Sequence, residues 1–224
     1  MKLTVEQIAF IEETLILNGV IYEDIKLELT DHIASEIEVK ITENETDFQS
    51  AMKEVFESWK NQFTHKNYSY WLGRGFSGPK IATDKMIKIV KSEYKWLAVL
   101  VVLCIIIFQF DLGLNLSRKT IDLLRLTIKG ILIFTLVTSL SARMRLVISK
   151  WNTTYSVLFK RKFGLIVLYS CAFLFNIYKI LPVDTDETSQ VFSLLFVTFF
   201  LFYTFNSFRL LANHFKIKKQ FEAV

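Results

Sequence analysis

Five polar residues close together in this chain have the types and the spacing that could do chemistry. They are Glu28, Asp31, His32, Glu36 and Glu38. In a helix, Glu28, His32 and Glu36 would lie on one side, because residues four apart are neighbours there. Carboxylates and imidazole bind metals, but the Glu-x-x-His spacing of di-iron bundles is absent and further ligands would have to come from another helix. We therefore expect a pH-sensitive histidine at a core boundary, hydrogen-bonded to a neighbouring carboxylate, and treat all five as candidates for packing or partner interaction.

Three predicted helices within residues 1–64, here called the head, would position these side chains. The first, residues 4–17, stops at Asn18-Gly19, a pair that favours a left-handed helix end. The third begins at residues 46–49, whose Thr-Asp-Phe-Gln sequence has the spacing of a capping box. The second, residues 22–41, has an apolar residue at every fourth position, which predicts one buried face: Ile21, Ile25, Leu29, Ile33, Ile37 and Ile41.

The charge is divided unevenly along the chain. Residues 1–66 contain 14 acidic and 6 basic side chains, whereas residues 67–224 contain 8 acidic and 21 basic ones. The basic residues flank apolar segments, where membrane topology and anionic lipids already account for them, so we expect no nucleic-acid partner. The acidic head could dock on the chain's own basic segment between Arg143 and Lys162, on a basic partner or on another copy.

Four apolar segments follow residue 95. They are residues 96–112, 126–142, 164–181 and 191–211, each close to the length of about 17 to 25 residues that crosses a bilayer as a helix. Lys129 lies about a turn inside the second segment and can extend to the headgroups. The fold class predicted is an all-α membrane protein, with a small three-helix cytoplasmic domain followed by four transmembrane helices in residues 96–224.

Basic residues predict the orientation, because those in short connections stay on the cytoplasmic side. They precede the first segment, separate the second from the third and follow the fourth. The other two connections contain Arg118, Lys119 and Arg125 in one case and Asp184, Asp186 and Glu187 in the other. We expect a multi-pass membrane protein with both termini in the cytoplasm.

A linker and an amphipathic helix are predicted between the head and the first segment. Residues 65–80 combine glycines with aromatic residues, as in a hinge near the headgroups or an ordinary exposed linker. Residues 81–95 place Met86, Ile87, Val90 and Tyr94 on one face and lysines on another, which favours an interfacial helix. Membrane lipids are therefore expected partners, and the candidate headgroup contacts are Lys85, Lys88, Lys91, Lys95, Arg143, Arg145, Lys160, Arg161 and Lys162.

The apolar segments contain few groups that could catalyse a reaction. Cys104 and Cys171 lie within them and are expected to pack as small apolar residues. Asn176 is the candidate intramembrane polar contact, either between helices or in a polar cavity beside Lys179. We expect a protein that is not an enzyme, with no catalytic residue, no metal site and no cofactor.

Residues 22–38, with Asp31-His32 and Glu36-Ile37-Glu38, and the Phe48 to Phe56 segment resemble the HAAS-type helical domain. This domain precedes multi-span regions in bacterial membrane proteins, and the chain is also similar to uncharacterised Bacteroidetes membrane proteins. The resemblance covers about residues 3–62 and implies a signalling or interaction module on a membrane body. The glycine often found between the last two helices of the domain is replaced here by Glu43-Asn44-Glu45.

Two functions follow as expectations. The first is a regulatory or accessory protein of the bacterial inner membrane, as the resemblance implies, whose head binds a protein partner or another copy of the chain. The alternative is an oligomeric pore or channel-like effector gated by the head, since four spans cannot enclose a pore within one chain. Its lining would be the Thr/Ser-bearing face of the second span.

Overall fold

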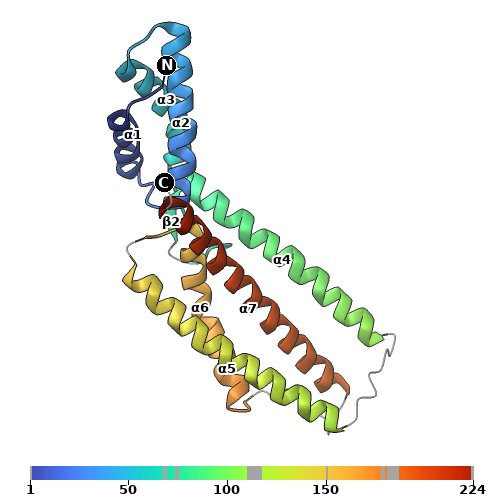
Figure 1. The fold of residues 1–224 in the computed structure, drawn as a ribbon. Helices are drawn as coiled ribbons and strands as arrows, with labels where there is room; N and C mark the ends of the chain where they lie inside the picture. The colour runs from blue at the N-terminus through green and yellow to red at the C-terminus, as the bar shows by residue number, and fades with distance from the viewer. Residues whose placement is uncertain are drawn as a thin grey trace. The chain divides into compact units, whose positions relative to one another are not determined.

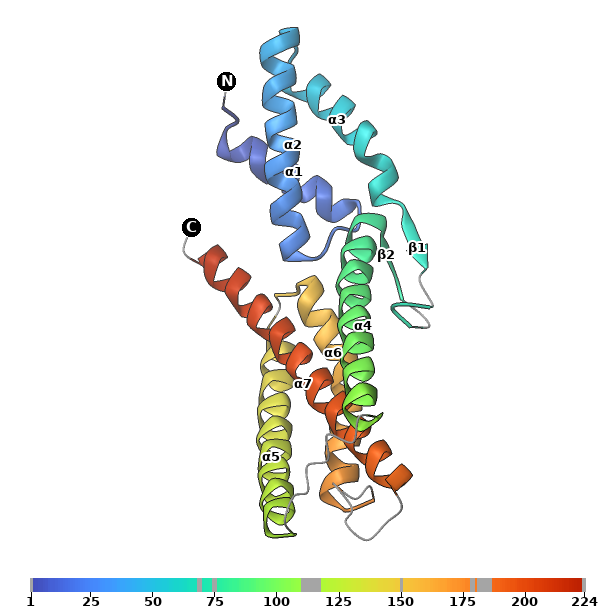
Figure 2. The same ribbon diagram turned by 90° about the vertical axis from the view of Figure 1, so that its right-hand side faces the viewer.

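The computed structural model describes residues 2–67, 70–73, 76–109, 118–149, 151–177, 180 and 187–222. Within these residues the fold is all-α apart from one two-stranded ribbon (Figures 1 and 2). The chain divides into two compact units. The first consists of Met1–Lys91 and Trp151–Thr154, and the second of Ser92–Lys150 and Tyr155–Val224.

Three helices come first in the chain: α1 (Val5–Leu17), α2 (Glu23–Asn44) and α3 (Phe48–Phe63). Thr4 caps α1 in a reciprocal capping box with Gln7. Gly19 follows α1 with a φ of +83°, a conformation that glycine adopts without strain. Asp47, one residue later than the sequence pattern suggested, caps α3 by accepting from the N–H groups of Gln49 and Ser50.

The core of the first unit is built on the apolar face of α2. The four central members of the predicted stripe, Ile25, Leu29, Ile33 and Ile37, are at most 2% exposed. Ile21 precedes the helix and is 59% exposed, so the stripe begins one turn later than expected. Buried residues of α1 and α3 complete this core: Ile11, Leu15, Ala51, Met52, Val55 and Phe63.

The predicted linker contains an antiparallel ribbon. Strand β1 (His65–Asn67) pairs with β2 (Ser77–Pro79), with His65 opposite Pro79 and Asn67 opposite Ser77. A Cβ atom at Gly19 would lie 2.9 Å from the His65 ring, so the turn after α1 and this ribbon approach closely. The ends of residues 65–80 are therefore ordered by pairing rather than forming a plain exposed linker, and residues 68, 69, 74 and 75 lie outside the described residues.

Helix α4 (Lys80–Gln109) runs without a break through the predicted interfacial helix and the described part of the first span. Met86, Ile87 and Val90 share one face, which is buried within the protein rather than left free for lipid, and Lys88, Lys91 and Lys95 are exposed. Tyr94 is 58% exposed and does not share the buried face. Residues 110–112 of the predicted span lie outside the described residues.

Three long helices make up most of the second unit: α5 (Arg118–Ile148), α6 (Thr154–Leu174) and α7 (Glu187–Glu222). Figures 1 and 2 show them alongside one another. Their shared core consists of Leu132, Phe173, Ile180, Val197 and Phe200. The Phe200 ring lies 5.9 Å from the rings of both Tyr169 and Phe173, centroid to centroid.

Two described helices are long and apolar enough to cross a membrane: Arg118–Ile148, with an 18-residue window of mean hydropathy 1.8, and Phe192–Phe221, with one of 1.6. They contain the predicted second span and all but the first residue of the fourth. The third predicted span, residues 164–181, is not helical over its whole length. Helix α6 ends at Leu174, and Asn176 has a φ of +55°, which ends a helix.

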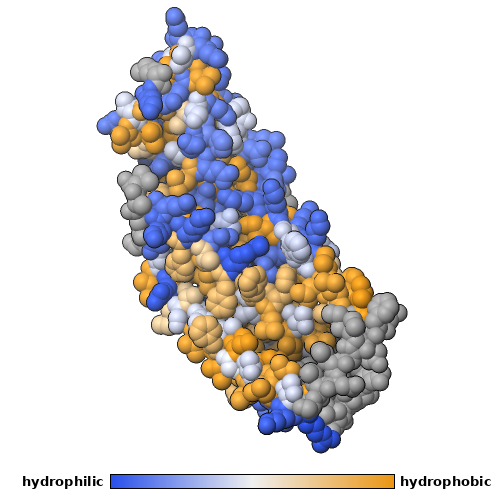
Figure 3. Space-filling view, turned by 45° about the vertical axis from the view of Figure 1, so that its right-hand side comes forward, coloured by the Kyte–Doolittle hydropathy of each residue, from blue (hydrophilic) through white to orange (hydrophobic). Residues whose placement is uncertain are grey.

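The second unit has an apolar surface and a partly polar interior. On the face shown in Figure 3, much of its described surface is hydrophobic. Only 17% of the apolar window of α5 and 39% of that of α7 is buried. Meanwhile Ser139, Ser156, Ser170 and Ser207 are fully buried. A water-soluble helical core has the opposite distribution.

Candidate functional site: a polar network and an exposed helix face

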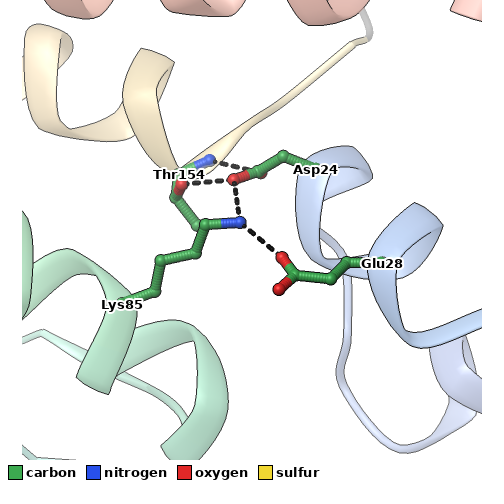
Figure 4. A network of polar contacts seen from close by, with 4 residues as sticks. All are labelled: Asp24, Glu28, Lys85 and Thr154. Atoms are coloured by element: carbon green, nitrogen blue, oxygen red, sulfur yellow. Dashed lines mark hydrogen bonds and ion pairs between the residues drawn. The ribbon is translucent and has the colours of Figure 1, made fainter. Parts of the chain in front are cut away.

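A buried carboxylate, Asp24, lies at the centre of a polar network in the first unit (Figure 4). It is 6% exposed. Its Oδ1 accepts from the backbone N–H of Thr154 at 2.8 Å, and its Oδ2 accepts from the Thr154 hydroxyl. The Lys85 ammonium lies 3.4 Å from Asp24 Oδ2 and 2.9 Å from Glu28 Oε2. The network therefore joins α2, α4 and the segment 151–154.

The position of Asp24 follows from two helix beginnings. Asp24 lies in the first turn of α2, and Thr154 is the first residue of α6. Backbone N–H groups at a helix N-terminus lack partners within the helix and favour a negative charge, so Asp24 caps α6 from outside it. The N–H of Glu23 also donates to the carbonyl oxygen of Asn152 at 2.9 Å. Both contacts tie the start of α2 to the connection between α5 and α6.

Three of the five candidate residues of α2 make packing contacts with different segments. Glu28 pairs with Lys85 of α4. Glu36 Oε2 accepts from the Trp59 indole N–H of α3 at 3.0 Å, and Glu38 Oε1 accepts from the backbone N–H of Leu3 at 2.9 Å. The acidic residues of the predicted series therefore contact three different segments rather than one common site.

The other two candidates, Asp31 and His32, lie on the exposed side of α2. The expected position of His32 at the core boundary is wrong, because its side chain is exposed to solvent. Among the residues that the structure describes, no group of three His, Cys, Asp or Glu side chains could hold a metal ion.

Helix α1 exposes an unusual amount of apolar surface for a helix in a small domain. Val5, Phe10, Ile16 and Leu17 are between 47% and 81% exposed. Glu6, Glu12 and Glu13 are interspersed with them. Because a Glu6 backbone N–H and the Thr4 side chain hydrogen-bond to the Glu6 carboxylate, its pKa is lowered and it stays ionised at neutral pH. The exposed face of α1 is therefore both apolar and acidic, as is common for a partner-binding surface.

The candidate headgroup contacts fall into two groups. Lys85 is paired with Asp24 and Glu28, and Lys162 forms an ion pair with Glu93 in which both side chains are at most 13% exposed. Lys91 lies 5.2 Å from the centre of the Trp71 ring, and Arg143 lies 5.9 Å from that of Phe163. Lys88, Lys95, Arg145 and Arg161 are exposed, while Lys160 is half-buried and its pKa is lowered by burial and by the charge of Arg143.

Asn176 lies two residues beyond the end of α6 and is exposed. Its Oδ1 accepts from the Lys129 ammonium of α5 at 3.0 Å. The side chain thus makes a contact between two segments, as one of the two interpretations expected. Its partner is Lys129, however, and Lys179 lies outside the described residues.

Comparison of this chain with family models, with curated proteins and with solved structures finds no match.

Two polar contacts were missed by sequence reasoning. Asp24 stands beside the candidate series but was not singled out, because its partner is 130 residues away in the chain. Glu93 is the second: it is one of two acidic residues, with Asp84, in the basic helix 81–95, and no signal in the sequence distinguished it. Both carboxylates are buried, and each is paired with a lysine that had been assigned to lipid headgroups.

Proposed function

We propose that this chain is a non-enzymatic regulatory or accessory protein of the bacterial inner membrane. In this proposal it has four membrane-spanning helices and a cytoplasmic head of the HAAS type, which binds a protein partner or another copy of the chain. The observation that carries the proposal furthest is the contact of Asp24 and Glu23 with residues 152–154.

That contact constrains how often the chain crosses a membrane. A segment that hydrogen-bonds to the head must lie on the same side of the membrane as the head. Residues 152–154 do so, and therefore an even number of crossings separates them from the first part of α4. Helix α5 is long and apolar enough to cross once. Helix α4, whose residues from Trp96 to Phe108 are all apolar, must then cross as well.

The basic residues support the same arrangement. It puts the ends of α5 and α6 that contain Arg143, Arg145, Arg161 and Lys162 on the cytoplasmic side of the membrane, as the positive-inside rule expects. The basic end of α7, with Arg209, Lys216, Lys218 and Lys219, then requires α6 to cross, because α7 crosses too. If only α5 and α7 crossed the membrane, the basic residues at the ends of α5 and α6 would lie on the outer side.

The surface of the second unit also supports membrane insertion. Phe134, Val137, Leu168 and Phe205 are more than half exposed. In water this exposure would be unfavourable by about 25 cal/mol per Å² of apolar area, whereas hydrocarbon solvates it. Inside the unit, the Thr135 and Ser207 hydroxyls donate to backbone carbonyls of their own helices at 2.9 and 2.8 Å, so they need no water.

The interaction role of the head rests on α1. Its exposed apolar residues alternate with carboxylates, which suits a partner that combines apolar and basic side chains. A photo-crosslinking amino acid at Leu17, which is 81% exposed, should give a discrete higher-mass product in membranes. The matched control is Lys53, which is exposed on α3.

The crosslinking experiment can support or contradict this interaction role. A product at position 17 and none at position 53 agrees with the proposal, and its mass separates a second copy from another protein. Only uncrosslinked chain at position 17, in membranes from cells that express it at natural levels, would contradict it.

The pore alternative is less well supported. It requires the Thr/Ser-bearing face of the second span to line a channel between copies. Thr135 is 8% exposed and Ser139 is fully buried within the second unit, so these two side chains are covered by the chain itself, whereas Ser141 is exposed.

A further inference from the structure

A groove between α4 and α7 has apolar walls and a cationic end. Its volume is about 300 Å³. Apolar side chains from both helices form the walls: Val99, Leu100, Leu103, Phe202 and Phe205. Trp96, Asn206 and Arg209 line the rest of the groove. All these residues belong to the second unit, so the groove is formed within one compact part of the chain.

The order of the lining residues along the helices separates the two ends of the groove. Trp96 and Leu103 are seven residues apart on α4, as are Arg209 and Phe202 on α7, which corresponds to about 10 Å along each axis. Trp96 and Arg209 also lie at the cytoplasmic ends of the first and fourth proposed spans. The polar end therefore coincides with the headgroup level, and the apolar walls extend toward the hydrocarbon.

Arg209 is available to an anion. It is exposed, and it has no carboxylate partner among the described residues, whereas the nearby basic residue Lys162 is paired with Glu93. Guanidinium binds phosphate well because its N–H groups match the phosphate oxygens in pairs. Trp96 is 61% exposed, and indole rings favour the same interfacial depth.

We propose that this groove binds one anionic phospholipid, with an acyl chain between α4 and α7 and the phosphate at Arg209. The proposal rests on the membrane placement described above. The proposed occupant is a lipid rather than free phosphate, because only the acyl chain of a lipid would fill the apolar part of the groove. One cationic residue near an anionic headgroup corresponds to about a fivefold preference over a zwitterionic lipid, from about 1 kcal/mol per charge.

Trp96 provides the test, because bromine atoms on acyl chains quench indole fluorescence at contact. The full chain is reconstituted with brominated phosphatidylglycerol or brominated phosphatidylcholine, and the Trp96 signal is obtained as the difference from Trp96→Phe. We expect phosphatidylglycerol to compete about fivefold better for the quenching position, from the same single-charge figure. Arg209→Gln should remove the preference, and Arg145→Gln, the same change at an exposed position on α5, should keep it.

The other outcomes of this experiment distinguish failure of the lipid site from failure of the membrane placement. Equal quenching by both lipids, or a preference that survives Arg209→Gln, would overturn the lipid site and leave the membrane placement intact. No quenching by either lipid would contradict the membrane placement itself. Displacement of the lipid by millimolar inorganic phosphate would show an anion site without a lipid chain and would also overturn the proposal.

Discussion

Replacing Asp24 by Ala should destabilise the first unit more than any other single change in the polar network. The carboxylate is buried, and its loss leaves the Thr154 N–H and hydroxyl without an acceptor. Hydrogen bonds to an ionised group contribute about 1.5–3 kcal/mol each, and Lys85 keeps Glu28 as a partner, so we expect a loss of about 3 kcal/mol. Glu28→Ala removes an exposed ion pair and should cost less than about 1 kcal/mol.

The assay is a urea titration of the full chain in mild detergent, followed by tryptophan fluorescence, to which Trp151, three residues before Thr154, contributes. Thr154→Val removes the hydroxyl and keeps the N–H. A double-mutant cycle with Asp24→Asn isolates the coupling between the two side chains, which should be about 1 kcal/mol or more. If Asp24→Ala costs no more than Glu28→Ala, the network does not hold α2 to residues 151–154, and the crossing argument loses its main support.

Three further predictions concern other parts of the chain. Gly19→Ala should destabilise by about 1–2 kcal/mol because of the positive φ and the nearby His65 ring, whereas Gly130→Ala, in open space on α5, should be neutral or stabilising; thermal unfolding separates them. Glu93→Gln should reduce the free energy of unfolding by about 3–5 kcal/mol, because it leaves Lys162 buried and unpaired. The double variant Glu93→Leu with Lys162→Met should recover most of that stability in the same thermal scan. If the double variant instead loses the sum of the two single-variant losses, the ion pair does not contribute as described. Hydrogen bonds from Ser50 and the α3 backbone lower the pKa of Asp47, so its contribution is present above the ordinary aspartate pKa of about 4 and is lost as the pH falls through the lowered value. The stability difference between wild type and Asp47→Ala should therefore shrink on acidification, and a difference independent of pH would refute this.

Local signals in the sequence predicted the helices of the head well. The Asn18-Gly19 pair and the isoleucine spacing of α2 act within a few residues, and the structure has the corresponding turn and buried face. The pairing of β1 with β2 was missed because a three-residue strand has too little periodicity to be recognised.

The candidate site was predicted less well, for a physical reason. Helical spacing shows which residues share a side, but not which side faces another helix. His32 was therefore placed at the core boundary although it is exposed, and Asp24 was passed over although it is buried. The partners Thr154 and Lys162 are far away in the chain, and contacts of that kind leave no local pattern.

The most direct test of the proposed arrangement is the side of the membrane on which Lys119 and Arg161 lie. In a chain whose Cys104 and Cys171 are replaced by Ala, single cysteines at positions 119 and 161 are exposed to a membrane-impermeant maleimide, with Lys53→Cys as the head control. Four spans predict that position 119 is labelled in intact cells, and that positions 53 and 161 are labelled only after permeabilisation. Labelling of position 161 in intact cells, with position 119 protected, would mean that α5 crosses without α4 and would contradict the account.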